Sequence, residues 1–321
     1  MHQKPKNEAH MRSFAALILA LLSCPVFAQQ AAKPLRLILL TPFVDYGFFG
    51  PVKKGAQDAA TAMNVQVTFS GTKDGDVKQL ANQVRQAVQD GYDGIALNII
   101  DPEAFDAAVA EAIQKKVPVI AFNVDDSRTS NARLAAVGQN MVAAGQAFGR
   151  KIAADVPAGS HILLTMHDPN ISALEDRARG IKETLKTKNI QWTELVTSTD
   201  REQGIKKIRS ALEADRSIKV VISTGSADTE AAGLAIEKFF AKDSMIAAGF
   251  DLSPDILRLV QAGTLRFTID QQPYSQGYFS VVALALNARY GVLPTNIDTG
   301  ATIIDRSAAE RVIELSRRGY R

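Results

Sequence analysis

The fold class is decided by residues 93–103, which read D-G-I-A-L-N-I-I-D-P-E. Five of the six residues that begin at Ile95 are apolar, Asn98 being the exception, as in a parallel strand that is covered on both faces. Asp101 can cap the N-terminus of a helix, and Pro102 suits the first helical turn. A buried strand that leads straight into a helix predicts one strand–helix unit of a parallel sheet.

The same alternation of apolar runs and amphipathic stretches continues in both directions. Apolar residues between Val77 and Val88 recur at three- and four-residue spacing, which predicts a helix. About ten strands are expected, which is too many for one ordinary sheet of this type. We therefore predict an α/β fold with two parallel sheets, each the centre of a Rossmann-like lobe. The expected strands are residues 35–40, 65–69, 95–100, 117–122, 134–137, 162–166, 192–196, 220–223, 245–249 and 267–269.

Residues 1–28 are predicted to be a secretory signal peptide. A short basic start at Met11-Arg12 precedes an apolar run at residues 14–22, and small residues lead up to Ala28. An apolar run of this length is too short to cross a ~30 Å hydrocarbon core. We expect cleavage after Ala28 and export to the periplasm. Residues 1–10 resemble an extension before the true start, so the choice between Met1 and Met11 stays open.

Composition excludes several classes of function. The net charge is only +3 and is spread along the chain, so no basic block indicates nucleic-acid binding. The single cysteine, Cys24, lies in the predicted signal peptide, where lipidation is the alternative to cleavage after Ala28. After cleavage only His161 and His167 remain as histidines, and neither belongs to a metal-binding spacing. We predict no metal, no cofactor and no catalytic residue.

Polar and aromatic residues gather where the expected strands end. Ligands of open α/β sheets bind beyond these carboxyl ends. Carboxylate and amide groups make paired hydrogen bonds that suit neighbouring sugar hydroxyls, and aromatic faces cover the apolar face of a sugar ring. With no recognisable nucleophile–base pair, the set favours binding over catalysis. The candidates are Tyr46, Phe48, Phe49, Asn98, Asn123, Asp125, His167, Asp168, Asp251 and Gln271.

Each of these candidates has a structural alternative when it is taken alone. Phe48 and Phe49 suit an ordinary core, and Asp251 suits a turn or the start of a helix. Asn123 and its neighbours suit a loop that they shape themselves, and Gln271 suits the surface. Their common position at strand ends is what favours one shared site.

Six motifs carry a resemblance to a known family. They resemble the periplasmic pentose- and hexose-binding proteins of the ribose-binding type, over nearly all of the chain from Leu35 to the expected strand at residues 302–304. The resemblance implies type I periplasmic binding protein architecture, with two lobes joined by three strands. The motifs are GFFGPVKKGA at 47–56, DGIALN at 93–98, VPVIAFN at 117–123, DRARG at 176–180, GFD at 249–251 and TIDQQP at 268–273.

The resemblance also implies lobe boundaries and residue roles. The N-terminal lobe would comprise residues 34–138 and 273–300, and the C-terminal lobe residues 139–272 and 301–321. Phe48 and Phe49 match ring-stacking aromatics, and Asn123 matches an aspartate that binds hydroxyls. Arg177 matches an arginine that reaches the ring oxygen or anomeric hydroxyl, although a salt bridge on a helix surface is its alternative without the family. Asp251 and Gln271 match hydroxyl ligands near the hinge.

Several pocket positions depart from the family pattern. Val124 stands where an arginine usually follows the hydroxyl-binding aspartate, and Thr199 stands where a second-lobe aromatic sandwiches the sugar. Ala227 replaces an asparagine, and Tyr46 stands where asparagine is frequent. We therefore do not predict a ribose binder; a furanose, a branched sugar, a polyol and another sugar-like molecule stay open as ligands. Asp125, His167 and Asp168 are expected to supply alternative contacts.

The expected function is capture of a monosaccharide or sugar-like polyol by hinge closure, followed by delivery to the membrane permease of an ABC transporter. A periplasmic receptor that reports to a chemoreceptor or sensor kinase shares this fold and stays an open alternative. A transcription regulator would need a helix-turn-helix where this chain has an export signal. We expect a monomer that binds no nucleic acid.

Overall fold

The structure is a computed structural model that describes residues 1–2, 33–101, 103–125, 131–169, 171–241 and 243–321. Most of the predicted signal peptide, with Cys24 and Ala28, lies outside the described residues. Within the described part, no helix is both long and apolar enough to cross a membrane. Pro34–Arg321 form one unit, separate from Met1–Lys33, and the following description concerns this unit.

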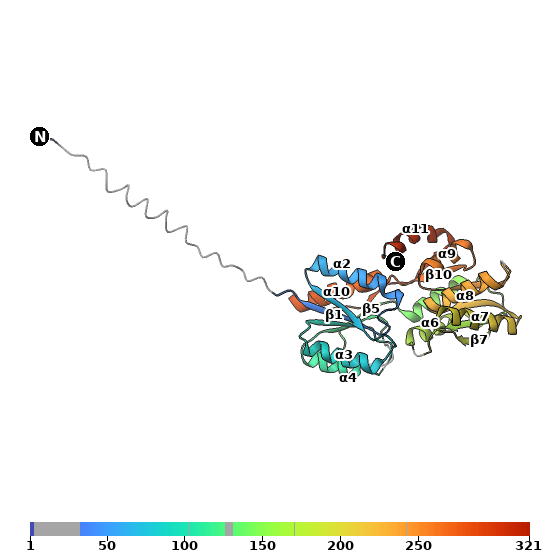
Figure 1. Cartoon of the computed structure of the whole chain (residues 1–321), viewed down its shortest axis with the longest axis horizontal. Coiled ribbons are helices and arrows are strands. Elements are labelled where there is room, and N and C mark those ends of the chain that lie inside the picture. Colours follow the sequence, from blue (N-terminus) through green and yellow to red (C-terminus); the bar gives the residue numbers. More distant parts are fainter. Residues whose placement is uncertain (3–32, 102, 126–130, 170, 242) are drawn as a thin grey trace. The chain divides into compact units, whose positions relative to one another are not determined.

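The first sheet has six strands, and all of its pairings are parallel. Leu37 and Leu39 point to helices α2 (Gly50–Met63) and α10 (Pro273–Tyr290) on one face. The alternate residues Ile38 and Leu40 pack with α3 (Val77–Gln89) and α4 (Asp106–Gln114) on the other (Figure 1). Helices on both faces explain why the strands are apolar without alternation. The strand order is β11 (Ile297–Asp298), β5 (Ala136–Gly138), β4 (Val119–Asn123), β3 (Gly94–Leu97), β1 (Arg36–Thr41) and β2 (Gln66–Gly71).

The second sheet also has six strands, and one of them is antiparallel. One face packs against α5 (Met141–Ile152) and α6 (Ser172–Leu185). The other face packs against α7 (Arg201–Ala214), α8 (Ser226–Phe239), α9 (Pro254–Ala262) and α11 (Arg306–Arg317). The strand order is β12 (Thr302–Asp305), β10 (Phe267–Asp270), β9 (Ile246–Phe250), β8 (Ile218–Ser223), β6 (His161–Met166) and β7 (Gln191–Val196).

The predicted α/β fold with two lobes is confirmed, with two corrections of detail. Each of the ten expected strands overlaps an observed one, but the two-residue β11 was not expected. β12 pairs antiparallel with β10, so the second sheet is mostly rather than wholly parallel. The expected strand at residues 95–100 ends at Leu97, because the chain leaves the sheet at Asn98.

The chain passes from one sheet to the other three times: between β5 and α5, between β10 and α10, and between β11 and β12. Side chains join these crossings to one another. Gln139 Nε2 donates to the carbonyl oxygen of Gly300 at 2.8 Å, and Gln272 Nε2 donates to that of Thr299 at 2.9 Å. Three short, mutually bonded crossings restrict the relative motion of the lobes to rotation about one region.

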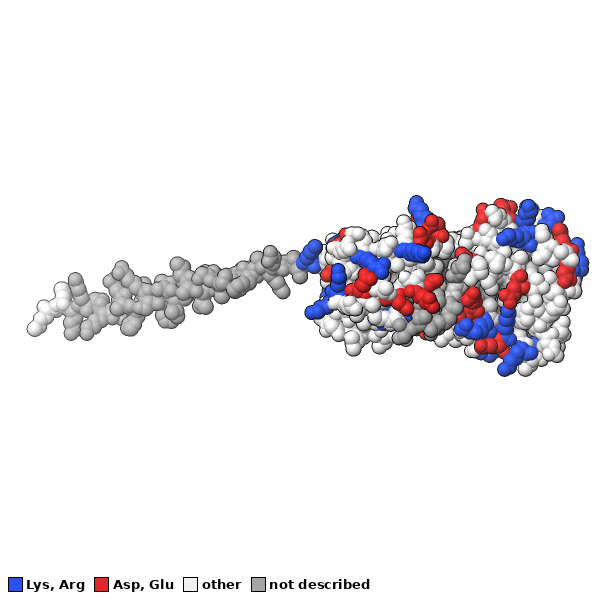
Figure 2. Space-filling model, turned by 90° about the horizontal axis from the view of Figure 1, so that it is seen from below, with Lys and Arg blue, Asp and Glu red and all other residues white. Residues whose placement is uncertain are grey.

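Surface charge is mixed on the face seen in Figure 2, where basic and acidic side chains lie interspersed. The picture fits the small net charge of +3. Other polar side chains are buried, among them Asn98, Asn123, Arg177, Asp251 and Gln271.

Candidate ligand-binding site

A cavity of about 350 Å³ lies at the carboxyl ends of the strands of both sheets. The residues that follow β1, β3, β4, β6, β9 and β10 all contribute to its wall. Nine of the eleven predicted site residues line it: Tyr46, Phe48, Phe49, Asn98, Asn123, His167, Arg177, Asp251 and Gln271. Residues scattered over more than two hundred positions are therefore brought to one cavity, as the strand-end rule predicts.

Asp125 and Asp168 do not line this cavity. The chain turns at Asn123, whose φ is 63°, so that Val124 forms part of the wall and Asp125 lies beyond it. Asp125 lines a separate pocket instead and is paired with Arg133. Asp168 follows His167 out of the wall and is partly exposed. Their placement gives no support to the predicted contacts of these two carboxylates with a ligand.

Two site residues hold a left-handed backbone at a strand end. Asn123 closes β4 with φ 63°, and Asp251 follows β9 with φ 70°. Most residues other than glycine avoid this region, whereas Asn and Asp tolerate it because their short side chains bond locally. Such strain typically collects at functional sites, where it aims a side chain away from the direction of the strand.

A hydrogen-bonded chain of amides begins in the first lobe. Asn98 Nδ2 donates to Thr41 Oγ1 at 3.0 Å and to Asn123 Oδ1 at 3.3 Å. Asn123 Nδ2 then donates to Gln271 Oε1 at 3.1 Å and to Gln276 Oε1 at 3.0 Å. All five side chains are buried, so each bond satisfies a polar group that has little access to water.

Asp251 fixes the direction of this chain of bonds. Its carboxylate can only accept, and Gln271 Nε2 donates to Asp251 Oδ1 at 2.6 Å. The Oε1 of Gln271 must then face Asn123, so residue 123 has to be a donor. Asparagine meets this requirement and an ionised aspartate does not. In this chain Asn123 supplies the donor, at a position where the family resemblance leads one to expect aspartate.

Arg177 is a buried cation of the second lobe, and only 2% of it is exposed. Its Nε and NH2 groups donate to Gln139 Oε1 at 3.2 and 2.9 Å, and NH1 donates to the carbonyl oxygen of Thr224 at 2.8 Å. Asp251 Oδ2 lies 3.5 Å from NH1 and supplies the opposite charge. The guanidinium also lies 4.4 Å from the centre of the Phe250 ring. The alternative of a salt bridge on a helix surface does not describe this position.

His167 presents an oriented ring to the cavity. Its Nδ1 lies 2.8 Å from Asp228 Oδ1, and Asp228 is completely buried. The other oxygen of Asp228 accepts from the backbone nitrogens of Thr224 at 2.7 Å and Gly225 at 3.3 Å, which holds the carboxylate in place. A neutral His167 that donates through Nδ1 has Nε2 as an acceptor. An acceptor of this kind suits a hydroxyl hydrogen.

The aromatic residues differ in their roles. Phe49 is 4% exposed, packs edge-to-face on Phe48 at 5.2 Å and also contacts Phe69, so it belongs to the core as well as to the wall. The Tyr46 hydroxyl lies 2.5 Å from Ser226 Oγ, which belongs to the other lobe. Burial is the main cause that raises the pKa of Tyr46 far above its usual value, so this phenol stays neutral.

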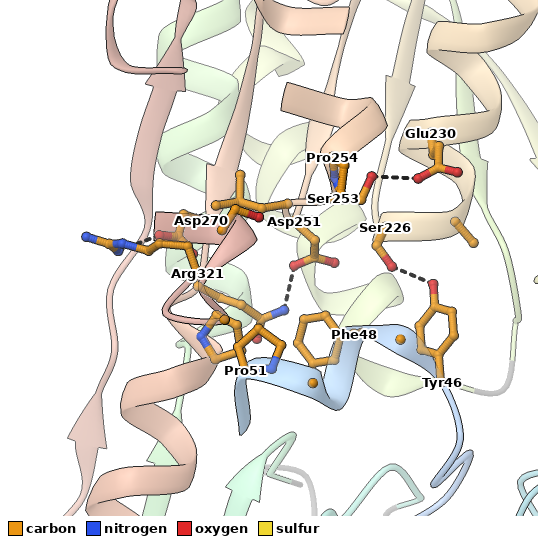
Figure 3. A pocket seen from close by; sticks show the side chains of 18 of the residues that line it. Tyr46, Phe48, Pro51, Ser226, Glu230, Asp251, Ser253, Pro254, Asp270 and Arg321 are labelled. Atoms are coloured by element: carbon orange, nitrogen blue, oxygen red, sulfur yellow. Dashed lines mark hydrogen bonds and ion pairs between the residues drawn. The ribbon is translucent and has the colours of Figure 1, made fainter. Parts of the chain in front are cut away.

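A larger outer pocket of about 660 Å³ adjoins the cavity (Figure 3). The hydroxyls of Tyr46 and Ser226 point toward each other and line both spaces, so their contact marks the common boundary. Charged groups line the outer pocket, among them the pair of Arg321 with the buried Asp270. Burial raises the pKa of Asp270, and Arg321 lowers it in part. This pocket is therefore more highly charged than the inner cavity.

Several residues that build the site were not predicted. Gln139 directly follows β5, so the strand-end rule would have found it, whereas Ser226 begins α8 three residues after the end of β8. Gln276 lies inside helix α10 and is fully buried, and Asp228 lies inside α8. For these two, only a polar residue in an apolar helix face could have served as a sign. Among the described residues, no group of three His, Cys, Asp or Glu side chains is placed to hold a metal ion.

Comparison with known proteins identifies the family. Residues 37–291 match the family model of the periplasmic binding protein domain. The chain belongs to this family. It is 28% identical over 300 residues to the xylose/arabinose-binding protein XylF of Sulfolobus acidocaldarius, covering 88% of this chain and 74% of that protein. It is 26% identical over 266 residues to the ribose import binding protein RbsB of Salmonella typhimurium, covering 82% and 88%.

Solved structures of the family have the same architecture. A carbohydrate transporter from Acidothermus cellulolyticus in complex with myo-inositol matches with a TM-score of 0.81 and 29% identity, covering 90% of this chain and all of that one. A periplasmic sugar-binding protein from Legionella pneumophila matches with a TM-score of 0.77 and 25% identity, covering 82% and 99%. The predicted membership in the ribose-binding type of periplasmic binding protein is confirmed.

Proposed function

We propose that the protein captures a monosaccharide or a sugar-like polyol in the inner cavity and delivers it to the permease of an ABC transporter. One observation carries the proposal: a continuous network of amides, a carboxylate and a guanidinium lines a cavity between two lobes. Planar polar groups that are held rigidly by one another suit adjacent hydroxyls. The names of the relatives, which bind xylose, arabinose and ribose, support the same class of ligand.

The proposed mechanism is closure of the lobes around the ligand. We place the N-terminal lobe at residues 34–138 and 273–300, and the C-terminal lobe at residues 139–272 and 301–321. Asn98 and Asn123 would contact the ligand from the first lobe, and Arg177 and Asp251 from the second. Closure removes water, so each correct hydrogen bond gains in strength and each unmatched hydroxyl costs about 1–3 kcal/mol. That cost supplies specificity.

Titration calorimetry over a broad panel of aldoses, ketoses and cyclic polyols tests the proposal. We expect saturable heat for at least one compound and recovery of that compound unchanged, as befits a binding protein. Asp251→Asn should weaken binding at least tenfold, because a charged hydrogen-bond acceptor is lost. No heat over the whole panel, with a protein shown to be folded by its thermal transition, would refute the proposal.

Export to the periplasm is a separate part of the proposal. The mass of the protein recovered from the periplasm should correspond to a chain that begins at Gln29. A mass that includes Cys24 with attached lipid would replace cleavage after Ala28 by lipidation. Sedimentation of the same sample is expected to show a monomer.

A further inference from the structure

One end of the ligand cavity is apolar. Ile100, Val124, Met141 and Ala173 form a buried cluster there, each between 4% and 7% exposed, and all four line the cavity. Ile171 packs against this cluster and also lines the cavity. We call these five residues the apolar wall. It contrasts with the amides and charges of the rest of the site.

The apolar wall is built from both lobes. Ile100 and Val124 lie in the loops after β3 and β4, whereas Met141 begins α5 and Ala173 lies in the first turn of α6. Among the described residues, the other four clusters of buried apolar side chains each belong to a single lobe. This cluster differs from them because its buried members come from both lobes, although Val77 also joins it to the core of the first lobe. It forms only where the lobes meet around the cavity.

The backbone at this end already has partners. The Val124 nitrogen donates to the carbonyl oxygen of Phe122 at 2.8 Å, and the Val124 carbonyl oxygen accepts from the nitrogen of Ile99 at 3.0 Å. The carbonyl oxygen of Ile100 accepts from the nitrogen of Ser172 across the lobes at 3.5 Å. A ligand hydroxyl placed against Ile100 or Val124 would meet carbon atoms and backbone groups that already take part in these bonds.

Lys73, the ammonium group among the described residues that line the cavity, does not change this character. Lys73 contributes to the lining, but its side chain is 81% exposed and lies 3.4 Å from Asp45. The pair faces water at the rim. The apolar wall itself therefore carries no charge that could recognise a hydroxyl or an anion.

We propose that the ligand is a deoxy or methylated sugar or cyclic polyol, with its methyl or deoxy carbon against Val124 and Met141. Its hydroxyls would meet Arg177, Asp251 and Gln271 at the polar side of the cavity. This inference rests on the proposed function and narrows its ligand class. A hydroxyl without a partner at the apolar wall lowers affinity roughly tenfold to a hundredfold, and a buried methyl group raises it about fourfold.

Matched pairs of compounds test the inference by calorimetry and thermal shift. The pairs are L-rhamnose with L-mannose, L-fucose with L-galactose, and pinitol with D-chiro-inositol; any other compound that binds is compared with its own deoxy or O-methyl analogues. We expect the methyl or deoxy member of the binding pair to bind at least tenfold more tightly. Equal or tighter binding of the fully hydroxylated member overturns the inference and leaves the proposed function standing. Absence of binding by every sugar and polyol refutes the proposed function itself.

A substitution in the wall gives a second test. Val124→Thr keeps the shape of the side chain but adds a hydroxyl, so the preference for the methyl or deoxy member should fall at least fivefold. Val137→Thr is the control, because Val137 is buried in β5 of the same lobe but does not line the cavity; in this variant the ligand preference should stay unchanged. If Val124→Thr does not fold, Met141→Thr takes its place, with Met141→Leu expected to keep the preference. An unchanged preference in the folded wall variant overturns the inference.

Discussion

The cavity has a polar wall, formed by Asn98, Asn123, Arg177, Asp251 and Gln271, and an apolar wall. Residues of both walls come from the same segments of chain, although the polar wall can bond hydroxyl groups and the apolar wall contacts carbon. Three polar residues of the network each have a residue of the apolar wall within four positions. The pairs are Asn98 with Ile100, Asn123 with Val124, and Arg177 with Ala173. The fold sets the position of the backbone in each segment. The side chain at each individual position then decides whether that part of the cavity binds a hydroxyl group or an apolar group of the ligand. A change at Val124 can therefore alter the ligand without disturbing the bonds that hold the hinge together.

The largest effect should come from removing the cation of the polar wall. Arg177→Met leaves Asp251 and Gln139 without their buried partner, so we expect unfolding free energy to fall by about 3 kcal/mol and ligand binding to weaken roughly a hundredfold or more. Chemical denaturation and calorimetry measure the two effects. Arg179→Met is the control, because Arg179 lies on the same helix, its side chain is 47% exposed, and its ion-pair partner Asp176 does not line the cavity. Near-natural affinity in Arg177→Met would show that the polar wall does not bind the ligand.

A subtler change tests the direction of the hydrogen bonds. Asn123→Asp replaces a donor toward Gln271 and Gln276 by an acceptor, which should cost about 1–3 kcal/mol of stability at neutral pH. A protonated carboxyl group can donate, so the difference from the natural chain should shrink at acidic pH. Asn287→Asp serves as control, because Asn287 donates to the carbonyl oxygen of Val292 near the surface. Equal stability of both variants at pH 7 would contradict the assigned direction.

A third prediction concerns the contact between Tyr46 and Ser226, at the boundary between the inner cavity and the outer pocket. Tyr46→Phe removes the hydroxyl that meets Ser226 across the lobes, and one hydrogen bond corresponds to roughly a twofold to tenfold loss of affinity. Small-angle scattering should show a shift of the ligand-free protein toward a more open form. Tyr92→Phe, which loses a bond to Thr68 within the first lobe, should show neither change. Unaltered affinity and scattering in Tyr46→Phe would remove this contact from the closing mechanism.

The smallest effect lies outside both walls, at Asp270 and Arg321. Because burial raises the pKa of Asp270 in the folded state, the native protein keeps a proton that the unfolded chain has released, and stability falls as pH rises from the ordinary carboxyl pKa to the raised one. Arg321→Ala removes a group that lowers this pKa, so the decrease in stability should continue to a higher pH than in the natural chain. The effect on the unfolding free energy should be less than about 1 kcal/mol. Thermal midpoints between pH 4 and 8 measure it. In an Asp270→Asn background the substitution should no longer change the pH profile; a persisting change would assign the effect elsewhere.

We expected the site residues to lie at the carboxyl ends of strands. This expectation was correct where the residue at the end of a strand also contributes to the cavity wall. Asn98, Asn123 and Asp251 follow this rule, and all three line the cavity. The expectation did not hold for Asp125 and Asp168. Asp125 lies two positions beyond Asn123, where the left-handed backbone turns the chain. Asp168 lies one position beyond His167, and its side chain is outside the cavity wall. The contacts themselves stay predictions until a ligand is measured.

The sequence by itself determined the elements and the two lobes, because apolar periodicity and helix-capping residues act over a few neighbouring positions. It also indicated which strand ends carry polar groups. Only the tertiary structure decided that Gln271 faces Asp251, that residue 123 must therefore donate, and that Val124 meets Met141 from the other lobe. These contacts join segments far apart in the chain, and no local pattern records which of them will meet or in which direction a buried hydrogen bond will run.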